Sequence, residues 1–210
     1  AAGPQGVPGP PGAGAELGLA TAISARSVPA MVNAINSSGY SAHGKGAGTY
    51  VSDALATSGL AAAHPRFCKQ SADGRYWRLA PADGWVTDTQ AGALVDGATF
   101  DDAAISALAA YVAAIPGIRK IRFIPGIRMV LPTGAGSAAT VFGLTSIDGL
   151  TIDWSGAVFA CARTFAEAQA TGNSVVFGLT GCKNLTAIGQ VQFTGPLTKA
   201  QINGAASAYG

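Results

Sequence analysis

The second half of this chain offers three carboxylates that could do acid–base chemistry: Asp148, Asp153 and Glu167. Glycoside hydrolysis needs two carboxyl groups flanking the scissile bond, about 5 to 10 Å apart depending on the mechanism. Asp153 alternates with Ile152 and Trp154, so in a strand it points outward if those two neighbours fill a core. A lone outward Asp is usually only solvated. The sequence therefore predicts no catalytic residue, and Asp153, Asp148 and Glu167 are only the nearest candidates.

The sequence also gives little support for a glycan-binding site, a lyase site or a metal site. Trp154 fits a core better than a sugar platform, although it is the nearest candidate for glycan binding. No Lys or Arg stands near a carboxylate cluster that could hold a cation, which argues against lyase chemistry. The three cysteines and two histidines lack the spacing of metal ligands. We therefore predict no metal and no cofactor.

A capped helix precedes these carboxylates in the chain. Its apolar residues recur at spacings of three, four and three, which places them on one helical face: Ile105, Leu108, Val112 and Ile115. Asp101 or Asp102 can accept the free amide hydrogens of the first turn, and either charge suits the positive end of the helix dipole. Pro116 cannot continue the helix, and Gly117 tolerates the reversal. We interpret Asp101 and Asp102 as structural caps.

An internal repeat follows the helix. Residues 141–145 recur as 176–180, and residues 150–151 recur at the same offset of 35 as 185–186. Such self-similarity is typical of a solenoid, whose coils bury their apolar edges against their neighbours. Residues 118–131 bend around Pro125 and Gly126 and are expected to begin the first coil. The 165–170 segment between the two copies is expected to be a short helical excursion.

Composition limits the function classes. The 210 residues suffice for one sizeable domain or two small ones. Only 11% of the residues are charged and the net charge is +2, so there is no electrostatic case for binding nucleic acid or an anionic membrane. Against 49% hydrophobic residues, so little charge favours burial between subunits. No signal peptide or bilayer-spanning run is visible. A loose basic group is expected to be solvated on the outside of the first coil: Arg119, Lys120, Arg122 and Arg128.

The front of the chain has a different character. Glycine falls at every third position over residues 3–14, with frequent proline between. This is collagen-like, and a collagen helix forms only when three chains wind together. A flexible proline-rich linker remains the alternative. A short helix is expected within 17–30, then strands and turns over 34–95, including a glycine-rich turn at 44–49.

Several segments together resemble bacteriophage tail spikes and tail fibres with a pectate-lyase-like β-helix. They are the glycine-rich 39–50 region, the Asp-Gly-Arg-Tyr-Trp-Arg-Leu run at 73–79, and the Asp-Gly-Ala-Thr-Phe-Asp-Asp run from Asp96 into the helix. The resemblance covers about residues 34–195. It implies a homotrimeric virion protein, assembled in the host cytoplasm, that docks on a phage tail or baseplate protein and attaches the phage to host surface polysaccharide.

We therefore expect a mainly β homotrimer with the first coils of a right-handed parallel β-helix. Five parts are expected: a collagen-like segment (1–16), a short helical linker (17–33), a small strand-rich adapter domain (34–95), a capping helix (96–117) and the start of the β-helix (118–210), continuing beyond the chain end. The expected function is a structural component of the phage tail. The alternative is a polysaccharide depolymerase whose active site lies mostly outside this segment. A secreted pectate-lyase-like protein fits less well, because the chain lacks a signal peptide and starts with the collagen-like run.

Overall fold

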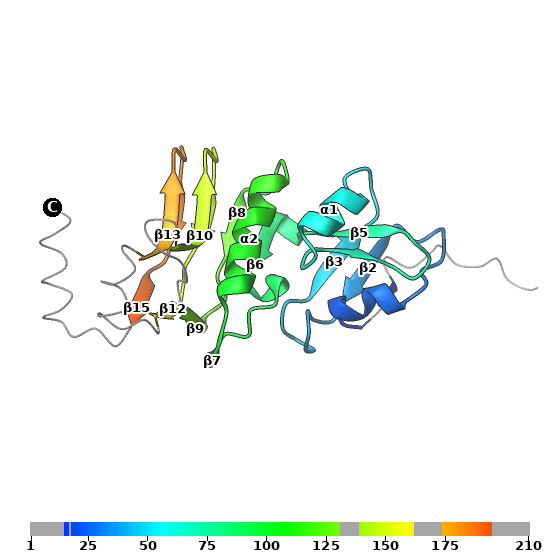
Figure 1. The fold of residues 1–210 in the computed structure, drawn as a ribbon, viewed down its shortest axis with the longest axis horizontal. Helices are drawn as coiled ribbons and strands as arrows, with labels where there is room; N and C mark the ends of the chain where they lie inside the picture. Colours follow the sequence, from blue (N-terminus) through cyan, green and yellow to red (C-terminus); the bar gives the residue numbers. More distant parts are fainter. Residues whose placement is uncertain (1–14, 17, 131–138, 162–173, 195–210) are drawn as a thin grey trace, which may run out of the picture.

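The computed structural model describes residues 15–16, 18–130, 139–161 and 174–194. Three expected features lie outside these residues: the collagen-like run at 3–14, the helical excursion at 165–170 with Glu167, and the tail at 196–210. The described part is mainly β, as expected. Its elements follow one another along one long axis, with an antiparallel sheet at one end and β13 and β15 near the other (Figure 1).

A five-stranded sheet, the front sheet, forms the first end. Its strand order is β1-β2-β3-β5-β4, and only the β1–β2 pair is parallel. The strands are β1 (Ala15–Glu16), β2 (Ala34–Ser37), β3 (Gly48–Val51), β4 (Cys68–Gln70) and β5 (Tyr76–Ala80). The expected glycine-rich turn lies between β2 and β3. Two short helices accompany the sheet: the 3-10 helix η1 (Ala20–Ala25), which falls within the expected 17–30 helix, and α1 (Ser58–Ala63).

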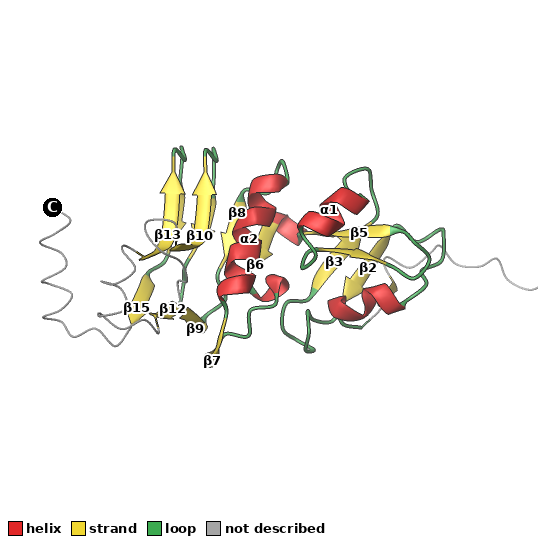
Figure 2. Cartoon of the chain, in the orientation of Figure 1, coloured by secondary structure: helices red, strands yellow, loops and turns green. Residues whose placement is uncertain are grey.

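Behind the front sheet, the remaining strands form three parallel sheets, which we call the parallel stack (Figure 2). One sheet has the order β14-β11-β8-β6, the second β15-β12-β9-β7, and the third pairs β10 with β13. The strands are β6 (Trp85–Thr87), β7 (Asp96–Phe100), β8 (Lys120–Arg122), β9 (Gly126–Val130), β10 (Ala139–Thr145), β11 (Thr151–Asp153), β12 (Ala157–Cys161), β13 (Ser174–Thr180), β14 (Thr186–Ile188) and β15 (Val191–Thr194). The β6 strand belongs to this stack although it falls inside the 34–95 range. Short 3-10 helices, η2 (Ala82–Gly84) and η3 (Thr89–Ala91), flank β6.

The register of the stack follows the sequence repeat. Phe142 pairs with Phe177 and Thr151 with Thr186, both at the offset of 35. The preceding layer has a different offset, since Ile121 pairs with Ile152, 31 residues later. Each strand therefore lies beside its counterpart from the next passage of the chain, and like side chains meet across the ladder.

The expected helix is α2 (Asp102–Ala114), and it packs against β10 at the front of the stack. Ile105, Leu108 and Val112 are buried as the spacing predicts, and the helix ends two residues before Pro116. The Ser106 hydroxyl also donates to the Val141 carbonyl at 2.7 Å. Helix α2 thus covers apolar side chains at this end of the stack.

Aromatic rings fill the interior of the stack. Phe123 stacks on Trp154 with a centroid separation of 4.9 Å and meets Phe142 and Phe159 edge to face at 5.6 and 5.4 Å. Phe177 continues the cluster into the next layer, 4.7 Å from Phe159. Edge-to-face and offset contacts add to the stabilisation from burial, so this ladder holds successive layers together.

Candidate functional site

Asp153 lies on β11 and forms an ion pair with Arg122 of β8. The Arg122 Nε donates to Asp153 Oδ2 at 2.9 Å, and the Ser155 amide donates to Oδ1 at 3.0 Å. The expectation of a solvated Asp153 is wrong, because only 13% of its side chain is exposed. Burial acts to raise the pKa of Asp153, but the Ser155 hydrogen bonds and the Arg122 guanidinium outweigh it and lower the pKa. Asp153 is therefore suited to accept these bonds as an anion and not to deliver a proton.

The sequence analysis missed Arg122 as the partner of Asp153. Register brings the two together, because Arg122 pairs with Asp153 across the β8–β11 ladder. The available signal was the alignment of Lys120-Ile121-Arg122 with Thr151-Ile152-Asp153 at an offset of 31 instead of 35. The Arg122 guanidinium also lies 4.4 Å from the centre of the Trp85 ring on β6. Asp153, Arg122 and Trp85 thus form one packed outer cluster.

Trp154 lies on the other side of β11. Its ring stacks on Phe123 with the planes 2° apart and meets Phe177 at 4.8 Å. A ring face covered by Phe123 cannot stack on a sugar. The structure therefore places Trp154 in the aromatic core, where the sequence favoured it.

Asp148 occupies the turn before β11. Its Oδ1 accepts from Asn184 Nδ2 at 2.8 Å, and its backbone bridges to Lys183 in the next layer. Among the described ion pairs and hydrogen bonds, none joins Asp148 or Asp153 to a second carboxylate, and Glu167 lies outside the described residues. Asp148 therefore ties two layers together, and both described candidates, Asp148 and Asp153, are bound by partners within the stack.

The structure corrects the capping role expected for Asp101. This residue holds the N-cap position of α2, but its side chain accepts no hydrogen bond from the first helical turn. Its carboxylate instead accepts from the amides of Leu94, at 2.8 Å, and Val95, at 3.2 Å. The chain turns sharply at Val95, whose φ is 53°, and this turn brings its amides to the carboxylate. Asp102 lies in the first turn of α2, where its charge suits the helix dipole.

A buried ion pair, which the sequence did not predict, lies beneath this turn. Arg128 and Asp88 are both fully buried, and Arg128 Nε donates to Asp88 Oδ2. The expectation that Arg128 is solvated with its basic neighbours is therefore wrong: on β9 it occupies an inward position. Its guanidinium also donates to the Gly126 and Ile124 carbonyls.

Asp88 binds the loop after β6 to the connection between β8 and β9. Its carboxylate accepts from the amides of Thr89, at 2.9 Å, and Ile124, at 3.2 Å. Burial raises the pKa of Asp88, although the Arg128 guanidinium and these two amides act to lower it. Burial also raises the pKa of Asp101, to which the charge on Asp88 adds. Each side-chain nitrogen of Arg128 donates to a protein acceptor, which indicates a structural role.

The described part of the chain has concave regions, of which two are considered for a site. One, of about 340 Å³, lies between the front sheet and the stack and is lined by the 44–47 loop, Thr87, Thr89, Gln90 and the residues around Val95 and Pro125. Its polar side chains already bind each other or the backbone, as Gln90 does with Ala47 O and Thr87 N. The other, of about 410 Å³, lies at the turns 155–158 and 189–192.

Within the described ranges, no three His, Cys, Asp or Glu side chains are grouped to hold a metal ion. Over the same ranges, no helix is long and apolar enough to cross a membrane. Comparisons with known protein families, with curated proteins and with solved structures found no match to this chain.

Proposed function

We propose that this chain is the virion-proximal part of a trimeric phage tail fibre or tailspike, with the stack as the first coils of a right-handed parallel β-helix. The observation that carries the proposal is the register of the parallel sheets, in which strands 31 to 35 residues apart pair along one axis. Such ladders form a stiff rod, because backbone hydrogen bonds run along its whole length. A stiff rod suits a protein that joins a virion to a cell surface.

The contacts between the front sheet and the stack support this mechanical role. The Tyr111 hydroxyl on α2 donates to the Leu79 carbonyl on β5 at 2.7 Å in a buried setting, and Arg66 donates to the Ala91 carbonyl at 2.7 Å. The Phe67 ring stacks on Tyr111 with a centroid separation of 4.3 Å. Buried contacts of this kind hold the two parts in one orientation, as a load-transmitting joint requires.

The far end of the described stack carries exposed apolar side chains. Phe159 is fully buried, whereas its register partner Phe193 is 57% exposed. Leu150 and Leu185, at equivalent positions of the repeat, differ in the same way, with 0% and 43% exposure. Exposed apolar side chains on unpaired strand edges are a template for further strands. The region that attaches to host surface glycans would adjoin this end in the proposed virion protein.

The carboxylates argue for attachment over depolymerase activity in the described part. Asp153 is neutralised by Arg122, and Asp148 is bonded to Asn184. General acid catalysis requires a carboxyl group that holds its proton near neutral pH. The lowered pKa of Asp153 is the opposite of this requirement.

Two measurements test the proposal. Light scattering on the purified full chain should give the mass of three copies, and a stable monomer would contradict the trimer. Antibodies raised against the chain should label the tails of virions in electron microscopy. Labelling of capsids alone, or of no particle, would contradict the assignment to a phage tail.

A further inference from the structure

The outer face of the β7-β9-β12 sheet carries an unusual set of side chains. Ile127 and Met129 on β9 lie in register with Val158 and Ala160 on β12, and Phe100 on β7 lies in register with Met129. Ile127 is 46% exposed and Phe100 is 52% exposed, while the other three side chains are partly buried. We call these five residues the apolar face.

The pattern of β9 is the reverse of that of an ordinary surface strand. Its charged residue, Arg128, points inward and is fully buried, whereas Ile127 and Met129 point outward. A strand with one face in water normally alternates apolar residues inside with polar residues outside. On its inner side, β9 therefore places Arg128 in the ion pair with Asp88. On its outer side, it places apolar side chains whose burial would be favourable.

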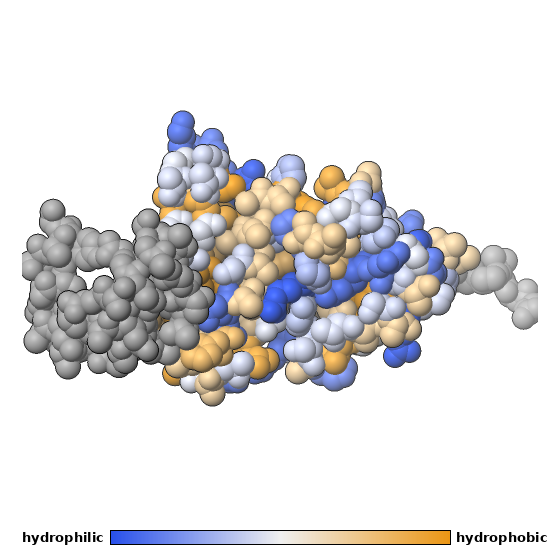
Figure 3. Space-filling view, viewed as in Figure 1, coloured by the Kyte–Doolittle hydropathy of each residue, from blue (hydrophilic) through white to orange (hydrophobic). Residues whose placement is uncertain are grey.

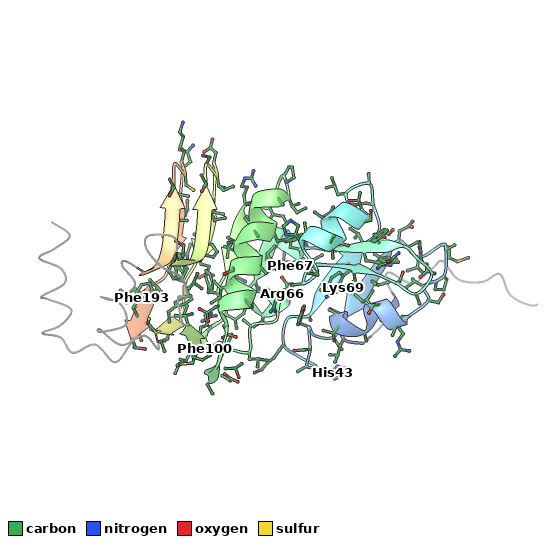
Figure 4. All side chains as sticks on the ribbon, viewed as in Figure 1. His43, Arg66, Phe67, Lys69, Phe100 and Phe193 are labelled. Atoms are coloured by element: carbon green, nitrogen blue, oxygen red, sulfur yellow. The ribbon has the colours of Figure 1, made fainter. Side chains whose placement is uncertain are left out.

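The neighbouring sheet differs on its outer side. The outer side of the β6-β8-β11 sheet carries Lys120, Arg122 and Asp153, of which the last two form an ion pair. Beyond β12 the apolar character also ends, because Gln192 and Thr194 of β15 occupy the equivalent positions. In Figure 3 apolar residues gather on the side of the molecule where β7 and β9 lie, and Figure 4 labels Phe100 there.

We propose that the apolar face is covered by a second copy of this chain in the assembled protein. The occupant follows from the other end of the sequence, where glycine falls at every third position over residues 3–14. That repeat is stable only as three chains around one axis, so it selects identical copies as the neighbours of each stack. Three parallel rods joined at one end lie side by side. The face that each turns toward its neighbour is then removed from water, which is favourable for the five apolar side chains.

This inference rests on the proposed trimer and deepens it by naming the surface. Because contacts elsewhere along the chain could also hold three copies together, mass alone does not test the face. The accessibility of single positions does. Leu55 provides a matched control, because it is 46% exposed like Ile127 but lies beside the front sheet.

The experiment uses the full chain with Cys161 and Cys182 replaced by serine. Ile127→Cys and Leu55→Cys variants are labelled with a maleimide at a concentration where light scattering reports three copies, and each rate is divided by that of the same variant unfolded in urea. We expect the Ile127→Cys rate to be at least about tenfold below the Leu55→Cys rate, because the interface protects it.

Two outcomes would overturn the proposal, and they are distinguishable. Equal rates in a particle of three copies would show that the apolar face points outward, while leaving the proposed trimer intact. A monomeric mass for the unmodified chain would overturn the face and the trimer together.

Discussion

At the scale of single residues, the same side chain has different roles in successive layers. Phe159 and Phe193 are register partners on β12 and β15, yet one is fully buried and the other is 57% exposed. Their rings are 5.9 Å apart. The difference comes from position in the stack, because only Phe159 has a described layer of strands on both sides.

This contrast predicts unequal costs of truncation. Phe159→Ala should lower the free energy of unfolding by about 3–5 kcal/mol, because it leaves a cavity in a packed core. Phe193→Ala should cost less than about 1 kcal/mol, because much of its ring is already in water. Urea unfolding of both variants measures the two values. Equal losses would show that Phe193 is as well buried in solution as Phe159.

The buried pair of Asp88 and Arg128 gives a second prediction at this scale. Asp88→Asn leaves the Arg128 guanidinium without its countercharge, which should cost about 3–5 kcal/mol of stability. Arg128→Met, which keeps an unbranched side chain between Phe123 and Phe159, should restore part of that loss in the double variant. Thermal or urea unfolding of the two single variants and the double variant tests this. Strictly additive losses would mean that the two charges do not interact.

At the scale of elements, hydrogen bonds from turns stabilise the ends of strands. Asp96 opens β7 and accepts from the amides of Ala98 and Thr99 and from the Thr99 hydroxyl. These bonds favour the charged form and lower the pKa of Asp96 to about 2. The turn therefore depends on a carboxylate and not on a carboxylic acid.

The pH dependence of stability follows from the direction of this shift. Because the pKa of Asp96 is lower in the folded chain than in the unfolded chain, its contribution is fully present above about pH 4 and is lost as the pH falls toward 2. Asp96→Asn should be less stable at neutral pH and should lose less stability over that range. Urea unfolding at several pH values measures both slopes. Parallel curves of unfolding free energy against pH for the two proteins would contradict this explanation.

At the scale of the whole molecule, the last strands of the described stack, β13, β14 and β15, each pair on one side only among the described residues. The β11 strand pairs with β8 on one side and β14 on the other, whereas β14 pairs in the described residues with β11 alone. The front sheet and α2 close the opposite end (Figure 1). Stability should therefore fall along the long axis from the front sheet toward β15.

Hydrogen exchange tests this gradient. Amide hydrogens of β8 and β11 should exchange more slowly than those of β14 and β15, because opening an inner layer breaks contacts on both sides. Mass spectrometry of peptides spanning each strand gives the rates. A uniform rate along the stack would mean that it opens as a single unit.

Local patterns in the sequence were sufficient for much of the fold. The spacing of Ile105, Leu108 and Val112 predicted the buried face of α2, and the 35-residue repeat predicted which residues pair between β10 and β13. Both depend on periodicity, which burial of one face imposes directly on the chain. The roles of single polar residues were predicted less well, since the Asp101 side chain does not bind the helix that it precedes.

Only the tertiary structure decided where the charged side chains go. Arg122 meets Asp153 because the β8 and β11 strands pair at an offset of 31, and Arg128 is buried because Asp88 lies inside the turn that follows β6. The sequence by itself determined a mainly β chain with one capping helix and a repeat, since these depend on local periodicity. Partners of charges are chosen by register between distant strands, and a shift of one residue turns a side chain from the core to the surface.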